Sequence, residues 1–371
     1  MSTLAIIKDD RYLEHNPGDG HPESPDRLRV IHELIAAEFS DLPLIEPRIA
    51  SEDEIAAVHD PFYIQTVANT EGRAFSRLDA DTGLSSRSYL VARLAAGSLL
   101  QAVDVLLGNP QSAIRVEKAP SPFFPLPPGE RGRGEGHVYP QSIFAFVRPP
   151  GHHAEPNRGM GFCLFNNIAI AAEYAIERHG LKRVLIVDWD LHHGNGTQKS
   201  FYDRPDVLFF SSHQYPYYPG TGNFDETGSG KGEGFTVNAP FPPGFGDTEY
   251  LSVYDRILKP IALEYKPELV LVSAGFDPYV KDPLGGMKLT GDGFGNLAAI
   301  VRKIAEATCG GKVLLTLEGG YDPDGLRDGV RSVLQALTGP AWTVPGIEAP
   351  AAERVIQSVI ARQKNYWKSL S

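Results

Sequence analysis

The chain has 371 residues, of which 42% are hydrophobic and 22% charged, and its formal net charge is −11. This acidic balance argues against direct nucleic-acid binding, because phosphate contacts need clustered Lys and Arg. It suits a cationic substrate better, although mild acidity is also an ordinary feature of soluble proteins.

Cysteine content and apolar runs narrow the class further. Cys163 and Cys309 are too few for a disulfide framework or a Cys-rich zinc module. The N-terminus lacks a basic stretch followed by a long apolar segment, and no run reaches the ~18 apolar residues of a membrane span. We therefore expect a cytoplasmic protein without a signal peptide or a membrane-spanning segment.

The first third of the chain predicts helices. Residues 51–54 read Ser-Glu-Asp-Glu, the pattern of a capping box, and Asp60-Pro61 places a cap before a proline at the first helical position. A long helix is expected from about Ser86 to Leu107, ending at Gly108.

Residues 117–140 are crowded with proline and glycine and show no periodicity. Such a composition predicts a flexible surface loop inserted into the domain. Because it precedes an expected strand, we expect it at the amino-terminal edge of the sheet, away from the site. An interaction loop is the alternative.

Short apolar runs then alternate with amphipathic helical patterns. The expected strands are 142–147, 183–188, 207–212, 268–274 and 312–318, and the expected helices are 163–179, 248–261 and 290–308. Apolar runs without polar alternation are typical of parallel strands covered on both faces, so the sequence predicts an α/β fold with a mainly parallel sheet. An amphipathic tail near 351–368 should pack Trp367 on the body.

Reactive residue types follow the expected strands, where open parallel sheets bind ligands. If the alternation of a strand continues past Asp188, then Asp188, Asp190 and His192 share one side. Asp277, after another strand, adds a third protein ligand to Asp190 and His192 and leaves a position open, as a catalytic zinc site requires. Iron or manganese also suits these ligands, and a helix-cap cluster with a core histidine is the non-metal alternative.

Two further groups follow strands. His152 and His153 are either additional ligands or acid–base groups, and Asp188 and Asn195 are the natural partners of their second nitrogens. Tyr321 follows a Gly-Gly turn that would bring its phenol towards the metal, where a hydroxyl stabilises an oxyanion. Packing is the alternative role for this tyrosine.

Taken together, the motifs resemble those of the histone deacetylase and acetylpolyamine amidohydrolase superfamily, in its class II-like, bacterial-type branch. The matching strings are HPESPDR (21–27), RPPGHHAEPNRGMGFCLFNN (148–167), DWDLHHGNGTQ (188–198), YYPGTG (217–222), SAGFDPYVKDPLGG (273–286) and LEGGY (317–321). The segment 117–140 matches no part of that pattern. The resemblance implies an arginase–deacetylase fold formed by a single deacetylase domain over residues 1–371.

The resemblance also implies roles for individual residues. Zn²⁺ would be held by Asp190, His192 and Asp277. His152 and His153 would form the acid–base pair, with Asp188 behind the first and Asn195 behind the second. A metal-activated water would attack, His153 would protonate the leaving amine and Tyr321 would polarise the acyl carbonyl. Structural K⁺ would lie near the zinc, at Asp188 and Ser211.

Substrate expectations rest on the same resemblance. Gly161, Phe162 and Tyr218 would line a narrow channel, with Asp81 as a rim carboxylate. Leu284 stands where polyamine-specific relatives carry a glutamate, which favours acetyl- or short-chain acyl-lysine substrates over acetylpolyamines and other small amides. An arginase-like binuclear hydrolase and a non-catalytic acyl-lysine binding module are less favoured. Family resemblance makes a homo-oligomer reasonable.

Overall fold

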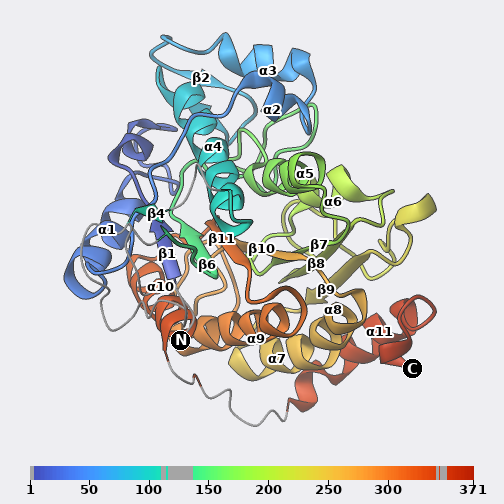
Figure 1. Cartoon of the computed structure of the whole chain (residues 1–371). Coiled ribbons are helices and arrows are strands. Elements are labelled where there is room, and N and C mark those ends of the chain that lie inside the picture. The colour runs from blue at the N-terminus through green and yellow to red at the C-terminus, as the bar shows by residue number, and fades with distance from the viewer. Residues whose placement is uncertain (1–3, 110–113, 116–136, 340–341, 343–348) are drawn as a thin grey trace.

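A seven-stranded, entirely parallel sheet forms the centre of the computed structural model, which describes residues 4–109, 114–115, 137–339, 342 and 349–371 (Figure 1). In spatial order the strands are β1 (Leu4–Ile7), β6 (Ser142–Ala145), β11 (Val313–Leu317), β10 (Leu269–Ala274), β7 (Val184–Asp188), β8 (Val207–Gln214) and β9 (Thr236–Phe241). All seven are buried along their length, as strands covered on both faces must be. The predicted α/β fold with a parallel sheet is confirmed.

The two edge strands, β1 and β9, were not predicted from the sequence. β1 has only four residues, Leu-Ala-Ile-Ile, and its apolar run stops at Lys8, whereas the apolar run of the equally short β6 continues through Phe146 and Val147. β9 contains Asn238 and Pro240, which are depleted in strands. Proline is tolerated in β9 because an edge strand leaves one row of N–H groups outside the ladder.

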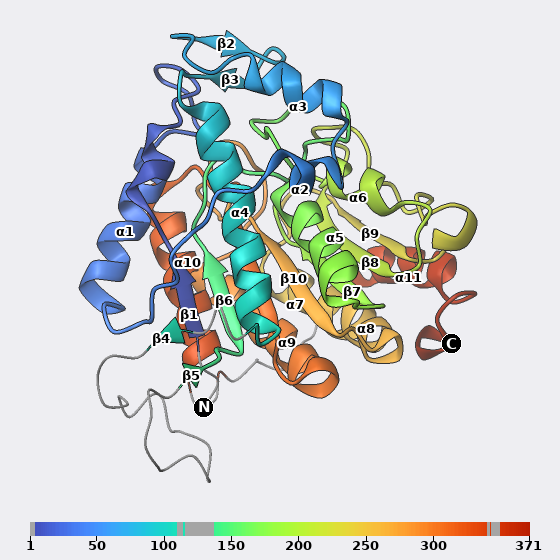
Figure 2. The ribbon, with the colours of Figure 1, turned by 45° about the horizontal axis from the view of Figure 1, so that its top comes forward.

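Helices cover both faces of the sheet (Figure 2). On one face lie α4 (Ser88–Leu106) and α5 (Asn167–His179), and on the other lie α7 (Asp247–Val253), α8 (Lys259–Tyr265), α9 (Gly291–Cys309) and α10 (Pro323–Thr338). The remaining described elements are α1 (Asp26–Glu38), α2 (Glu52–Ala56), α3 (Pro61–Ala68), α6 (Asn195–Phe201), α11 (Glu353–Gln363) and the short strands β2 (Ser76–Arg77), β3 (Gly83–Leu84), β4 (Ile114–Arg115) and β5 (His137–Val138). The capping box at Ser51 and the proline start at Pro61 are both present.

Helix α4 is long and apolar enough to cross a membrane, although no membrane span was expected from the sequence. However, 83% of its apolar window is buried inside the protein, where it packs against α5 and β6. It is therefore the core helix of this fold.

Three predicted elements need correction. Helix 163–179 begins only at Asn167, because the Asn166 side chain accepts the Ala169 N–H at 3.0 Å and caps it. The segment predicted as one helix over 248–261 is α7, a π-helical turn and α8 in succession. In the tail, α11 ends at Gln363, but Trp367 does pack on the body, donating its indole N–H to the Gly234 carbonyl at 2.9 Å.

Most of the predicted loop at 117–140, namely residues 117–136, lies outside the described residues. Its last part is not irregular, since β5 pairs antiparallel with β4. This short ladder lies by the amino-terminal ends of β1 and β6 (Figure 2).

Candidate metal centre and active site

The order of the strands places the candidate site. From β7 the chain runs outward through β8 and β9, then returns to β10 beside β7 and continues to β11 on the other side. The strands that follow β7 therefore lie on one side of it, and β10 and β11 lie on the other. Open parallel sheets bind ligands at such a topological switch point, here between β7 and β10. Asp190 and His192 follow β7, and Asp277 follows β10.

These three residues form a candidate metal-binding group whose ligand atoms all lie within 4.8 Å of one another. His192 Nδ1 is 3.2 Å from Asp190 Oδ1 and 3.0 Å from Asp277 Oδ2. Both carboxylates are almost completely buried, so they need a cationic partner in place of water. Two carboxylates and an imidazole facing one point fit a divalent metal with three protein ligands.

Backbone groups hold the two carboxylates in place. The Gly319 N–H donates to Asp190 Oδ2 at 2.8 Å, and the Leu191 N–H donates to Asp277 Oδ1 at 2.9 Å. At Gly275, the residue after β10, a Cβ atom would overlap the Asp190 carboxylate, so only glycine lets the chain pass this closely.

We expected the alternation of the strand to continue through His192, and this prediction is wrong. Strand β7 ends at Asp188, and residues 190 and 192 reach the site from the loop that follows. Asp188 instead supports that loop, because its Oδ1 accepts the Asp190 N–H at 3.1 Å.

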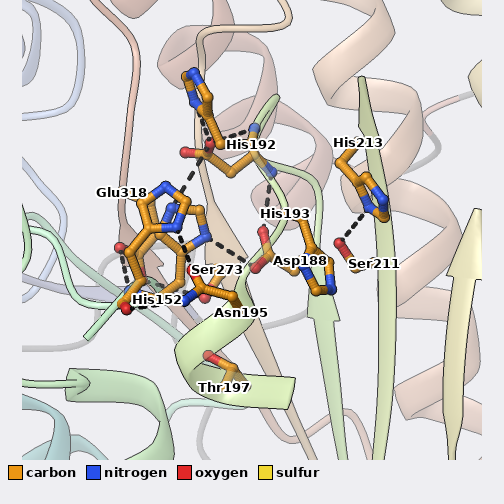
Figure 3. Close-up of polar contacts among 12 residues, drawn as sticks. His152, Asp188, His192, His193, Asn195, Thr197, Ser211, His213, Ser273 and Glu318 are labelled. Carbon is orange, nitrogen blue, oxygen red and sulfur yellow. Dashed lines mark hydrogen bonds and ion pairs between the residues drawn. The ribbon is translucent and has the colours of Figure 1, made fainter. Parts of the chain in front are cut away.

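His152 and His153 lie side by side, with ring centroids 4.0 Å apart, and each has the predicted partner. Figure 3 shows His152 directed towards Asp188. His152 Nδ1 is 3.0 Å from Asp188 Oδ2, and His153 Nδ1 is 2.8 Å from Asn195 Oδ1. His152 Nε2 is 3.8 Å from Asp190 Oδ1, which places that nitrogen on the side of the candidate metal group.

The two histidines differ in their pKa values. Burial lowers the pKa of His152, but the carboxylates of Asp190 and Asp188 outweigh burial and raise it to about 10. Burial and the neighbouring imidazoles hold the pKa of His153 well below its ordinary value. The site therefore contains one imidazole that favours the charged form beside one that favours the neutral form.

Glu318 is a buried acid directly after β11 and was not predicted from the sequence as a site residue. Its Oε2 accepts the N–H groups of Gly151 at 2.6 Å and His152 at 3.2 Å, and its Oε1 accepts the Ser273 hydroxyl at 3.1 Å. Burial raises the pKa of Glu318 to about 7, although His152 opposes this shift. Its position as the last residue of the predicted strand 312–318 could have marked it as a site residue.

Tyr321 follows β11 through Gly319 and Gly320, and Gly320 has a φ of 114°, which favours glycine. The Arg27 guanidinium lies 4.9 Å from the centroid of the tyrosine ring. Burial raises the pKa of Tyr321 well above its ordinary value, and the carboxylates of Asp277 and Asp190 act in the same direction. The phenol therefore keeps its proton at neutral pH and is available as a donor.

Aromatic rings surround the histidine pair and Tyr321. The ring of Phe162 is edge-on to Tyr321 at 5.9 Å, and that of Tyr218 is edge-on to His153 at 5.2 Å. Gly161 has a φ of 56°, and a Cβ there would overlap the His153 ring. The structure thus brings the three predicted channel residues, Gly161, Phe162 and Tyr218, to the site.

Other rim contacts were only partly foreseen. Tyr217, which the sequence reading did not assign, stacks on His192 at 5.7 Å and donates its hydroxyl to the Leu284 carbonyl at 3.1 Å. Asp81 is exposed, and its carbonyl lies 3.0 Å from the His21 ring nitrogen. Ser211 is paired with Asp188 in the ladder between β7 and β8, and its hydroxyl lies 2.9 Å from His213 Nδ1.

Comparison with known proteins decides the family. The histone deacetylase domain matches residues 21–337, most of the chain. This chain belongs to the histone deacetylase family. A rice (Oryza sativa subsp. japonica) protein, "Histone deacetylase 10, chloroplastic", is 37% identical over 91% of this chain and 74% of its own length.

Other relatives of this histone deacetylase family member carry names that describe different deacetylases. A "Probable deacetylase" of Archaeoglobus fulgidus is 36% identical over 86% of this chain and 82% of its own length. The human "Polyamine deacetylase HDAC10" is 40% identical over 88% of this chain and 46% of its own length. The crystal structure of the HDA15 HD domain superposes with a TM-score of 0.84 at 36% identity, covering 100% of this chain and 98% of that one. The predicted arginase–deacetylase fold is confirmed, and the family supports a deacetylase that hydrolyses amides.

Proposed function

We propose that the protein is a zinc-dependent amidohydrolase that removes acetyl or short acyl groups from acyl-lysine-type amines. The observation that carries the proposal is the three-residue group of Asp190, His192 and Asp277 beside two histidines with unequal pKa values. A non-catalytic binding module would not need a neutral imidazole, a charged one and a protonated phenol around one point.

Asp190, His192 and Asp277 would hold the metal. When bound, a divalent metal supplies a Lewis acid that lowers the pKa of a coordinated water to about 7. Three protein ligands with an open position suit Zn²⁺, while the two oxygen ligands also suit Fe²⁺ or Mn²⁺. We further propose structural K⁺ near Asp188 and Ser211.

His153 would act as the general base and then as the general acid. Because its pKa is lowered, it is neutral at pH 7 and able to take a proton from the attacking water. It would return that proton to the leaving amine. His152, which favours the charged form because of Asp188 and Asp190, would stabilise the negative charge that develops on the substrate.

Tyr321 would donate a hydrogen bond to the acyl oxygen. Its raised pKa keeps the phenol protonated, so the bond strengthens as that oxygen becomes an anion. Phe162 and Tyr218 would hold the alkyl part of the substrate between their rings, with Gly161 leaving room beside His153. Asp81 would meet the substrate at the rim.

Leu284 supports a lysine-type substrate over a polyamine. Its backbone is held by Tyr217, which stacks on His192, so residue 284 lies near the entrance to the site. A leucine there offers no carboxylate to an internal ammonium group. The alternative, an acetylpolyamine or another small amide, is favoured by the 40% identity to a human protein named as a polyamine deacetylase.

A deacylation assay on the zinc-loaded protein tests the proposal. The panel holds acetyl-lysine peptides, trifluoroacetyl-lysine peptides and acetylated polyamines, with a hydroxamate inhibitor as the control for metal-dependent turnover. Hydroxamate-sensitive turnover of lysine peptides is expected. Preference for polyamines would overturn the substrate while keeping the chemistry, and no turnover with stoichiometric zinc would overturn the deacylase proposal for these substrates.

A further inference from the structure

Glu155 is a buried carboxylate that the proposed mechanism does not use. It lies two residues after His153 and is 7% exposed. The Asn195 side-chain amide donates to its Oε1 at 2.9 Å, while Asn195 Oδ1 lies 2.8 Å from His153 Nδ1. A continuous hydrogen-bonded chain therefore runs from Glu155 through Asn195 to His153.

Two cations keep Glu155 charged and fixed. Lys199 Nζ donates to Oε2 at 2.8 Å, and Arg158 donates to both carboxylate oxygens at 3.0 Å. Burial raises the pKa of Glu155, but the hydrogen bonds from Arg158 and Lys199 outweigh burial and lower it. Lys199 and Asn195 are four residues apart on α6, so they share one helix face towards this carboxylate.

A charged Glu155 determines which way the Asn195 amide points. An ionised carboxylate only accepts hydrogen bonds, whereas the two ends of an amide differ, one donating and one accepting. The reversed amide would set two oxygens 2.9 Å apart, so the NH₂ group faces Glu155 and the carbonyl faces His153. His153 must then donate from Nδ1, and in the neutral ring this leaves Nε2 without a proton.

His152 needs no such arrangement. Its partner Asp188 is a carboxylate, and either of its oxygens accepts from Nδ1. The two ends of the Asn195 amide are not equivalent, and its hydrogen bond to Glu155 sets its orientation.

We propose that Glu155 is a positioning residue that, through Asn195, fixes the Nδ1–H tautomer of His153 and so presents an unprotonated Nε2 to the reaction. The catalytic part of this statement rests on the proposed role of His153 as general base, whereas the tautomer does not.

A double-mutant cycle of Glu155→Gln and Asn195→Asp tests the catalytic part. With Asn195 present, Glu155→Gln should lower kcat about tenfold or more, as loss of an outer orienting partner does, with little change in KM. With Asn195→Asp present, the same Glu155→Gln change should cost less than about twofold, because an aspartate accepts from His153 without being oriented. Equal losses in both backgrounds would reduce Glu155 to a structural role and overturn the proposal.

Glu173→Gln is the matched control. Glu173 is also 7% exposed and paired with an arginine, Arg204, but its partners lie outside the site. Turnover in this variant should match the unsubstituted protein, whereas Glu155→Asp should recover part of the kcat lost in Glu155→Gln.

Nitrogen-15 NMR of histidine-labelled protein tests the tautomer without any assay of activity. His153, assigned with a His153→Ala variant, should show a protonated Nδ1 in the unsubstituted protein and a mixture of tautomers in Glu155→Gln. An unchanged tautomer in Glu155→Gln would overturn the proposal. If the tautomer changes but the unsubstituted protein hydrolyses none of the amides, the positioning of His153 by Glu155 would be supported and the proposed deacylase function would be refuted.

Discussion

The two adjacent histidines show how different surroundings give one side chain two different pKa values. His152 faces the carboxylate of Asp188, and His153 faces the amide of Asn195, at similar distances. The carboxylates of Asp190 and Asp188 favour the charged form of His152. Burial and the neighbouring imidazoles favour the neutral form of His153, and its hydrogen bond with Asn195 only partly offsets them. This difference fits the two different roles proposed for His152 and His153.

The phenol of Tyr321 gives the sharpest test at this scale. Tyr321→Phe should lower kcat about 10²- to 10³-fold, because it removes one donor to the developing oxyanion, while the zinc content stays stoichiometric. Steady-state kinetics and metal analysis on the same preparation check both parts. Tyr366→Phe, which removes a phenol bonded to Glu233 at the surface, is the control and should change neither value. Near-normal turnover in Tyr321→Phe would refute the role of the phenol.

Asp277 tests the ligand group. Asp277→Ala should lose zinc and activity together, because it leaves only Asp190 and His192 to bind the metal. Metal analysis after dialysis measures the loss, with Asp255→Ala, at an exposed ion pair with Lys259, as the control. A variant that retains full zinc would remove Asp277 from the ligand set.

At the residue scale the sequence predicted the groups that carry chemistry better than those that hold them. The predicted partners of His152 and His153 are both in place, because the residues after parallel strands meet at one edge. The sequence did not predict three residues that contact the site, namely Glu155, Tyr217 and Glu318. Their contacts depend on side-chain packing between segments far apart in the chain, as with Glu318 and Gly151, and local pattern does not contain this information.

At the scale of elements, the strands that lead into the site were predictable and the edges were not. The strands β7, β8, β10 and β11 have five or more residues, and the apolar run of β6 continues beyond the strand to Val147. The run of β1 instead stops after four residues, and β9 holds a proline. The start of α5 was misplaced because Leu164 and Phe165 continue its apolar pattern although Asn166 caps the helix after them.

Buried charges connect the turn before α1 to β6 and β11. Glu23 accepts from Arg148 at 2.5 and 2.8 Å and from Arg27 at 3.0 Å, and Arg27 donates to the Gly320 carbonyl at 2.6 Å. Burial raises the pKa of Glu23, but Arg148 and His15 outweigh it and hold the pKa well below 4.5. This network therefore supports the backbone that carries Tyr321.

Glu23→Gln should lower the free energy of unfolding at pH 7 by about 3–5 kcal/mol, because it leaves buried arginines without their counter-charge. A depressed pKa in the folded state gives stability that is present above the unfolded value of 4.5 and is lost as the pH falls below it. The difference between the two proteins should thus shrink by about 1.4 kcal/mol per pH unit below 4.5.

Urea unfolding at pH 7 and at pH 3.5 measures this difference. Glu38→Gln, which breaks an exposed pair with Arg331, is the control and should cost no more than about 1 kcal/mol. A difference that stays constant between the two pH values would show that the charge of Glu23 is not what stabilises the fold.

At the scale of the whole molecule, metal binding should stabilise the fold. Asp190 and Asp277 are buried carboxylates that repel each other, and a divalent cation between them removes that cost. Zinc at 100 times its Kd should add about 2.7 kcal/mol to the free energy of unfolding. Thermal unfolding should show a lower Tm after chelation and recovery when zinc is restored. The same recovery in Asp277→Ala would mean that zinc stabilises the protein from another place.

The strand order also sets a sequence of events during synthesis. β1 with β6, and β7 with β8 and β9, belong to two separate halves of the sheet, and β10 and β11, the last two strands made, fill the gap between them. A nascent chain that has not yet emerged beyond β9 contains Asp190, His192 and both histidines of the pair, but neither Asp277 nor Tyr321. The proposed metal site and active site are therefore complete only after β10 and β11 have been synthesised, so an unfinished chain should neither bind the metal nor hydrolyse amides.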